Sequence, residues 1–79
     1  MRIVLTNHAR LRATQRGISF EEIVDCILNP DKLSTEPDSK VCYKKLLNTS
    51  LLLCYTTDKN GDIVVITVIK TSKISKYFT

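Results

Sequence analysis

The chain contains 79 residues, which predicts one domain over residues 1–79 with a small hydrophobic core. Hydrophobic residues form 43% and charged residues 25% of it, a balance typical of a folded globular domain and unlike that of a disordered chain. The longest apolar runs, at residues 51–55 and 63–66, are too short to cross a membrane. The net charge of +4 fits a nucleic-acid partner, and it fits an ordinary basic surface equally well.

The first elements are predicted to be a short strand and a helix. Residues 2–5 are mostly apolar and favour a strand. Thr6 or Asn7 can cap the helix that follows, because its side-chain oxygen can accept a hydrogen bond from a free backbone N–H. We expect this helix to span residues 8–16 and to end at Gly17, which readily adopts the left-handed conformation.

The second helix carries the clearest local pattern of the chain. Ser19 and Glu22 form an S-x-x-E capping box, and Ile18 and Ile23 are spaced as a hydrophobic staple. The helix is expected to end at the Asn-Pro step that follows it, because a residue before proline avoids the helical region. An apolar stripe with helical spacing is expected to face the core: Phe20, Ile23, Val24, Ile27 and Leu28.

The second half of the chain is predicted to contain three strands that follow a polar loop. Asn60-Gly61 is a strong signal for a tight hairpin turn between the last two of them. The C-terminal tail could pack as an edge strand or as a short helical turn. The ranges are 31–40 for the loop, 41–46, 50–57 and 62–69 for the strands, 70–73 for a second polar loop and 74–78 for the tail.

This order, β-α-α-β-β-β plus a C-terminal tail, predicts an α+β fold. Two N-terminal helices should pack on one face of a small, twisted, mainly antiparallel sheet. Strict alternation would place Ile63, Val65, Thr67 and Ile69 together on one face. If the strand registers match, Tyr55 and Thr67 line the face opposite the helices.

The three cysteines, Cys26, Cys42 and Cys54, lie far apart and form no C-x-x-C pair. This spacing disfavours a zinc site, and an odd number of cysteines without a signal-peptide pattern indicates the reducing cytoplasm. We therefore expect buried free thiols and a chemistry that uses no metal or other cofactor.

A ridge of basic side chains on the first helix is the main candidate for chemistry. At about 100° per residue, His8, Arg12 and Gln15 fall within about 60° of one another, and Arg16 extends the row. Arginines can hold a phosphate while the histidine transfers a proton near neutral pH. The same spacing also fits a structural use, in which the arginines pair with carboxylates of the second helix and His8 has no special role.

A second basic group follows the last strand. Lys70, Thr71 and Lys73, with Tyr77 after them, combine cations for phosphate, a hydroxyl donor and an aromatic ring for base stacking. A solvated basic C-terminus would have the same composition. The lysine pair at residues 44–45 is expected to be solvated.

These residues together resemble a small prokaryotic family of domains of unknown function. The shared pattern reads H-x-x-x-R-x-x-x-R-G-I-S-x-E-E from His8 to Glu22, followed by an Asn-Pro step and by a V-I-T-V strand that leads to T-S-K. The family is similar to the BrnT and RelE toxins, and it belongs with the wider barnase–colicin–RelE group of metal-independent ribonucleases.

The resemblance implies a RelE/BrnT-like domain that acts as a toxin-like endoribonuclease, cleaving RNA by attack of a ribose 2′-OH on the adjacent phosphate. It implies RNA as substrate and an antitoxin protein as a possible partner. Its catalytic residues would be His8, as acid or base, with Arg12, Lys70 and Thr71. Tyr55 and Thr67, on the expected face opposite the helices, join this group. The residues that bind RNA would then be Arg16, Lys73, Tyr77, Tyr55 and Thr67.

Two other functions fit the same residues. The domain could be a non-catalytic RNA- or protein-binding module that keeps the fold without the chemistry. It could also be a small interaction domain whose arginines are structural. An RNA cleavage assay without metal separates the first function from these two.

Overall fold

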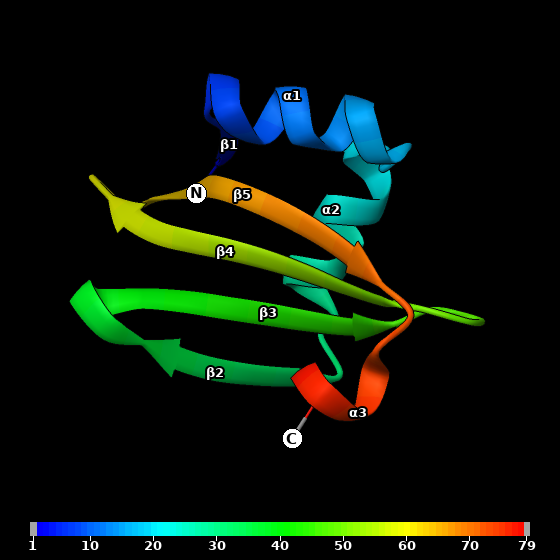
Figure 1. Cartoon of the computed structure of the whole chain (residues 1–79). Coiled ribbons are helices and arrows are strands. Elements are labelled where there is room, and N and C mark those ends of the chain that lie inside the picture. Colours follow the sequence, from blue (N-terminus) through cyan, green and yellow to red (C-terminus); the bar gives the residue numbers. More distant parts are fainter. Residues whose placement is uncertain (1, 79) are drawn as a thin grey trace.

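A computed structural model describes residues 2–78 and has the α+β architecture that the sequence predicts (Figure 1). Helices α1 (Asn7–Arg16) and α2 (Phe20–Leu28) cover one face of a five-stranded mixed sheet, and the short helix α3 (Ile74–Tyr77) packs on the other face. The strand order is β1-β5-β4-β3-β2, with β1 parallel to β5 and the other neighbours antiparallel. The strands are β1 (Ile3–Leu5), β2 (Lys32–Glu36), β3 (Lys40–Leu46), β4 (Leu51–Lys59) and β5 (Asp62–Thr71).

The two N-terminal helices begin and end where their capping residues predict. The Thr6 side chain accepts a hydrogen bond from the Ala9 N–H at 3.1 Å, so α1 begins at residue 7, one residue earlier than expected. Gly17, with a φ of 65°, ends α1 in the left-handed conformation. At the start of α2, Ser19 Oγ accepts from the Glu22 N–H, and the Glu22 carboxylate accepts from the Ser19 N–H. The predicted capping box is therefore confirmed.

The polar loop expected at residues 31–40 is wrong. Strand β2 and a 3-10 turn, η1 (Pro37–Ser39), occupy this segment, and β2 pairs antiparallel with β3. β2 is an edge strand whose five side chains are all exposed or half-buried, so it needs no apolar alternation to form. Its backbone pairing, which depends on residues of β3, decides the structure instead.

A β-bulge interrupts the pairing of β4 with β5. Tyr55 lies opposite Thr67, but the next residue, Thr56, lies opposite Val65. One residue of β5, Ile66, therefore has no counterpart on β4.

The bulge reverses the alternation of side chains along the rest of β5. The expectation that Ile63, Val65, Thr67 and Ile69 share one face is wrong. Ile63 and Val65 pack in the core beneath the helices. Ile69 packs with Tyr55 on the opposite face, and Thr67 lies beside it as the cross-strand partner of Tyr55.

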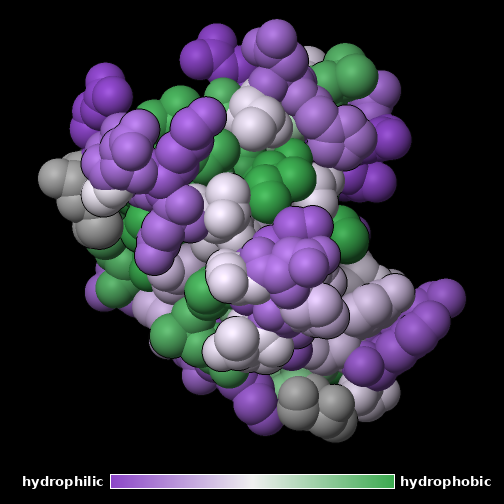
Figure 2. Space-filling model, turned by 90° about the vertical axis from the view of Figure 1, so that its left-hand side faces the viewer, coloured by the Kyte–Doolittle hydropathy of each residue, from purple (hydrophilic) through white to green (hydrophobic). Residues whose placement is uncertain are grey.

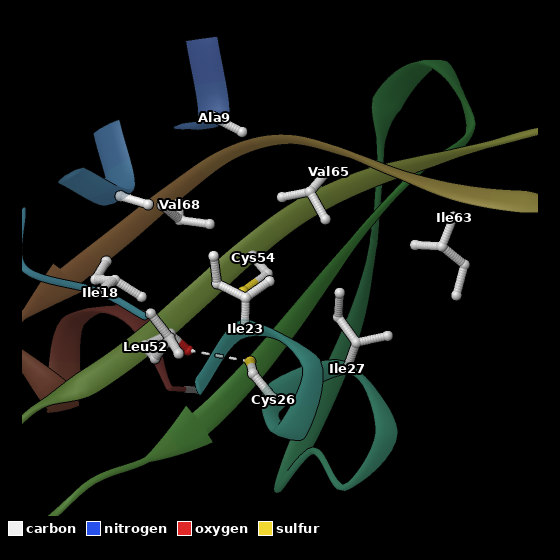
Figure 3. Packing of buried hydrophobic residues seen from close by; sticks show 11 residues of the cluster. Ala9, Ile18, Ile23, Cys26, Ile27, Leu52, Cys54, Ile63, Val65 and Val68 are labelled. Carbon is white, nitrogen blue, oxygen red and sulfur yellow. Dashed lines mark hydrogen bonds between the residues drawn. The ribbon is translucent and has the colours of Figure 1, made fainter. Parts of the chain in front are cut away.

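Two hydrophobic clusters lie on the two faces of the sheet. In the larger one, which Figure 3 shows from close by, the Cys26 thiol of α2 donates to the Leu52 carbonyl of β4 at 3.8 Å. The expectation of buried free thiols is confirmed for all three cysteines. The smaller cluster is built on Cys42, Leu51 and Leu53, and α3 covers it. The larger cluster consists of Ala9, Ala13, Ile18, Ile23, Cys26, Ile27, Leu52, Cys54, Ile63, Val65 and Val68.

The apolar stripe expected on α2 is wider than the face that the helix buries. Ile23, Cys26 and Ile27 are buried, whereas Phe20 is 50% and Leu28 57% exposed. Exposed hydrophobic residues are also visible at the end of the molecule that carries the β4–β5 turn, where they lie between hydrophilic ones (Figure 2). Within residues 2–78, no helix has the length and apolarity needed to span a membrane.

Replacing Ser19 by alanine should lower the free energy of unfolding by about 1 kcal/mol, because the Glu22 N–H loses its side-chain acceptor. Ser19 is exposed, so the change leaves the core packing intact. Chemical denaturation measures the effect. Ser72→Ala, at an exposed position outside the helices, is the control, and equal stabilities of the two variants would contradict the role assigned to the capping box.

Candidate nucleic-acid interface

The basic ridge of α1 runs beside an unpaired stretch of β5. β1 ends opposite Val65, so residues 66–71 of β5 have no strand on that side. Thr6 Oγ1 donates to the Ile66 carbonyl at 3.1 Å, and Arg16 Nη1 donates to the Val68 carbonyl at 3.0 Å. Both ends of α1 are therefore bound to the free edge of β5.

Arg12 and Arg16 of the ridge do not pair with carboxylates of α2. Arg12 Nη1 donates to Gln15 Oε1 within α1 at 3.0 Å, and Arg16 reaches the strand carbonyl. Within residues 2–78, the ion pairs are Arg2–Asp62 and Lys45–Asp25, so neither ridge arginine pairs with a carboxylate of α2. Each guanidinium keeps further N–H groups that could bind a phosphate.

The structure places His8 and Lys70 at opposite ends of α1. His8 is exposed in the first turn, eight residues before Arg16, which corresponds to about 12 Å along the helix axis. Lys70 is the cross-strand partner of Leu52 and faces the helices at the start of α2. There the N–H of Ser19 is the main cause that lowers the pKa of Glu22, and the positive charge of Lys70 contributes. Lys70 thus lies at the Arg16 end, away from His8.

Thr71 lies on the other face of the sheet from Lys70. It is opposite Leu51, which belongs to the cluster beneath α3. Its Oγ1 accepts a hydrogen bond from the N–H of Lys73 at 3.1 Å, so it shapes the connection into α3. The four candidate catalytic residues are therefore divided between the two faces, and their catalytic role stays a prediction.

The face away from α1 and α2 brings several of the candidate RNA-binding residues together. Tyr55 and Thr67 form a cross-strand pair on this face, as expected from the sequence. Tyr77 of α3 packs against the same cluster, and Thr71 lies on the same face of β5. Lys73 is exposed in the connection between them. We refer to this side of the sheet as the open face.

The phenol of Tyr55 is held in its neutral form. Burial raises the pKa of Tyr55 to about 12, and the neighbouring Cys42 thiol adds to the effect. Burial also raises the pKa of Cys42 above its ordinary value. At neutral pH the phenol is therefore a hydrogen-bond donor, and it suits an anionic ligand better than it suits proton abstraction.

The expectation that Lys44 and Lys45 form a solvated pair is wrong for Lys44. Its side chain lies on the open face and the residue is only 8% exposed. Lys45 points to the helix side, where its Nζ binds the Asn29 carbonyl at 2.8 Å and lies 3.7 Å from Asp25. Alternation along a strand was the available signal, because adjacent residues must face opposite sides of a sheet.

Two hollows in the surface lie away from the candidate residues. One, of about 480 Å³, lies between β1, Arg10 and Phe20, and another of about the same size lies along the outer side of α2. Neither hollow is lined by a residue of the α1 ridge (His8, Arg12, Gln15 and Arg16) or by a residue of the open face.

A protein-family model, DUF4258 (domain of unknown function), matches residues 5–70. The chain belongs to the DUF4258 family. The match covers α1, α2, β2, β3, β4 and β5 as far as Lys70, and this agrees with the resemblance to a small family of domains of unknown function. Curated proteins and solved structures give no match.

Replacing Arg16 by alanine should lower the free energy of unfolding by about 1–2 kcal/mol, because the Val68 carbonyl at the free edge of β5 loses a charged donor. Arg12→Ala is the matched control, since its bond to Gln15 is exposed and stays within one helix. Thermal or chemical unfolding measures both variants. If Arg16→Ala were no less stable than Arg12→Ala, the bond from Arg16 to the Val68 carbonyl would contribute nothing to the free energy of unfolding.

Proposed function

We propose that this DUF4258 domain binds single-stranded RNA across its open face. The observation that carries the proposal is the position of Tyr55, Thr67 and Tyr77 on the side of the sheet opposite α1 and α2, where the short helix α3 covers only part of the face. Aromatic rings can stack on bases, hydroxyl groups can bind ribose and phosphate oxygens, and a net charge of +4 favours a polyanion.

The open face also fits RNA in its extent and its charge. It runs across β2 to β5 and is edged by the exposed lysines Lys32 and Lys73. Lys76 lies 5.3 Å from the ring centre of Tyr77, so a cation accompanies the aromatic group on α3. A strand of RNA could place its bases on the tyrosines and its phosphates on these lysines.

Replacing Tyr77 by leucine should weaken the binding of a single-stranded RNA by about 1–3 kcal/mol, the usual value of one base stacked on an aromatic ring. Fluorescence anisotropy with a labelled oligonucleotide at several salt concentrations measures the affinity. Phe20→Leu removes an aromatic ring that is 50% exposed on the helix side, and it should leave the affinity unchanged. Equal losses in the two variants would argue against the open face.

Metal-independent RNA cleavage is the second candidate function. It would make the domain a toxin-like relative of BrnT and RelE, acting on RNA in the cytoplasm and held in check by an antitoxin. The observation that favours it is the anchoring of α1 to β5. Thr6 and Arg16 bind the Ile66 and Val68 carbonyls, so the helix that carries His8 and Arg12 is held along the edge of β5, next to the strand that bears Thr67.

In this reaction, His8 would take the proton of a ribose 2′-OH while the 2′-oxygen attacks the adjacent phosphorus. The bond from phosphorus to the 5′-oxygen of the next nucleotide breaks, that oxygen takes up a proton, and a 2′,3′-cyclic phosphate remains. Arg12 would stabilise the charge on the phosphate oxygens. Lys70, on the helix side near α2, would take no part in this arrangement.

If the domain cleaves RNA, His8→Ala should reduce the cleavage rate by about 10²- to 10⁴-fold, the usual contribution of a general acid or base. The assay uses a labelled RNA, a chelator and a pH series that spans the titration of histidine. Asn7→Ala, an exposed change on the same helix turn, is the control. Binding without cleavage by the unmodified domain would exclude this second function and leave RNA binding in place.

A further inference from the structure

Lys44 combines a buried stem with an ammonium group that has no partner among residues 2–78. The residue is 8% exposed, and within residues 2–78 its ammonium forms no hydrogen bond and no ion pair. In that part of the chain, every fully enclosed side-chain nitrogen or oxygen of a buried residue has a hydrogen-bond partner. Since the ammonium of Lys44 has none, it must keep a small opening to solvent. Its aliphatic stem is buried, and its charge lies at the surface of the open face.

A second cation lies next to it. Lys32 of β2 is the direct cross-strand partner of Lys44, and like charges in such a position destabilise a sheet. Two carboxylates flank this pair, and each accepts a hydrogen bond from another group. Asp31, next to Lys32, accepts from the Leu46 N–H at 2.7 Å, and Glu36 accepts from the Ser34 hydroxyl. Lys32 and Lys44 are therefore adjacent positive charges that, within residues 2–78, form no ion pair with either carboxylate.

Aromatic and neutral donor groups surround this pair. The ammonium of Lys32 lies 5.5 Å from the centre of the Phe78 ring, which packs on the open face beside α3. Tyr55, on β4, is the diagonal neighbour of Lys44 and keeps a neutral hydroxyl group. Two cations, a phenol donor and a low-polarity wall suit a compact oxyanion.

We propose that Lys44 and Lys32 bind a phosphate group on the open face. The ligand class is a phosphate oxyanion, which RNA supplies as a phosphodiester and solution supplies as free phosphate; the RNA form of the proposal rests on the proposed function. The bound anion would neutralise the two ammonium groups, and the hydroxyl of Tyr55 would be within reach to donate to it. Such a ligand would explain why two ammonium groups without ion-pair partners lie side by side on this face.

Lys44→Met tests the proposal, because methionine keeps the length of the stem and removes the charge. Lys45→Met is a matched control, since it makes the same change one residue away on the opposite face of the sheet. Lys32→Met, at an exposed position, provides a second variant if Lys44→Met fails to fold. Thermal unfolding is followed in inorganic phosphate and in sodium chloride of equal ionic strength, and RNA binding is measured as a function of salt.

Phosphate should raise the melting temperature of the unmodified domain and of Lys45→Met, and this shift should be lost in Lys44→Met and reduced in Lys32→Met. For RNA, Lys44→Met should reduce the slope of log K against log salt by about 0.7, the value for one phosphate contact on a single strand. A phosphate shift that depends on Lys44 without any RNA binding would support the phosphate site and refute the proposed function. No phosphate shift together with an RNA salt slope independent of Lys44 would overturn the phosphate site alone.

Discussion

The extra residue of β5 at Ile66 decides which side chains meet on each face of the sheet. Before the bulge, Ile63 and Val65 fill the core beneath α1 and α2, and after it the same face receives Val68 and then Lys70. Without the bulge, Thr67 and Ile69 would be buried beneath the helices and Val68 would leave the core. One unpaired residue thus supplies both the core and the hydroxyl-bearing open face from a single strand.

The same strand also fixes α1. An edge strand has unpaired carbonyl groups that cost free energy unless water or a side chain satisfies them. Here Thr6 binds the Ile66 carbonyl and Arg16 binds the Val68 carbonyl, and the two bonds hold the helix along the edge. This use of Arg16 explains why a ridge of like charges can exist on α1 without carboxylate partners. It also keeps the His8 end of the helix away from Lys70.

Local patterns predicted the parts of the fold that depend on a few neighbouring residues. The caps at Thr6 and Ser19 and the Asn60-Gly61 turn follow from short-range hydrogen bonds and from φ values that these residues tolerate. The open-face position of Tyr55 was also predictable, because alternation holds on β4 up to the bulge.

Features that depend on distant partners could not be read from the sequence. β2 forms because β3 pairs with it, and the bulge exists only relative to β4. The separation of His8 from Lys70 depends on how α1 crosses the sheet, which no local pattern encodes. The burial of Lys44 is the most informative case. Its stem is buried, yet its charge lies beside a second cation, and like charges in cross-strand positions do not stabilise a sheet. Local rules are most often broken where a residue serves a ligand rather than the fold, and Lys44 breaks the rule on the face where Tyr55, Thr67 and Tyr77 are already gathered.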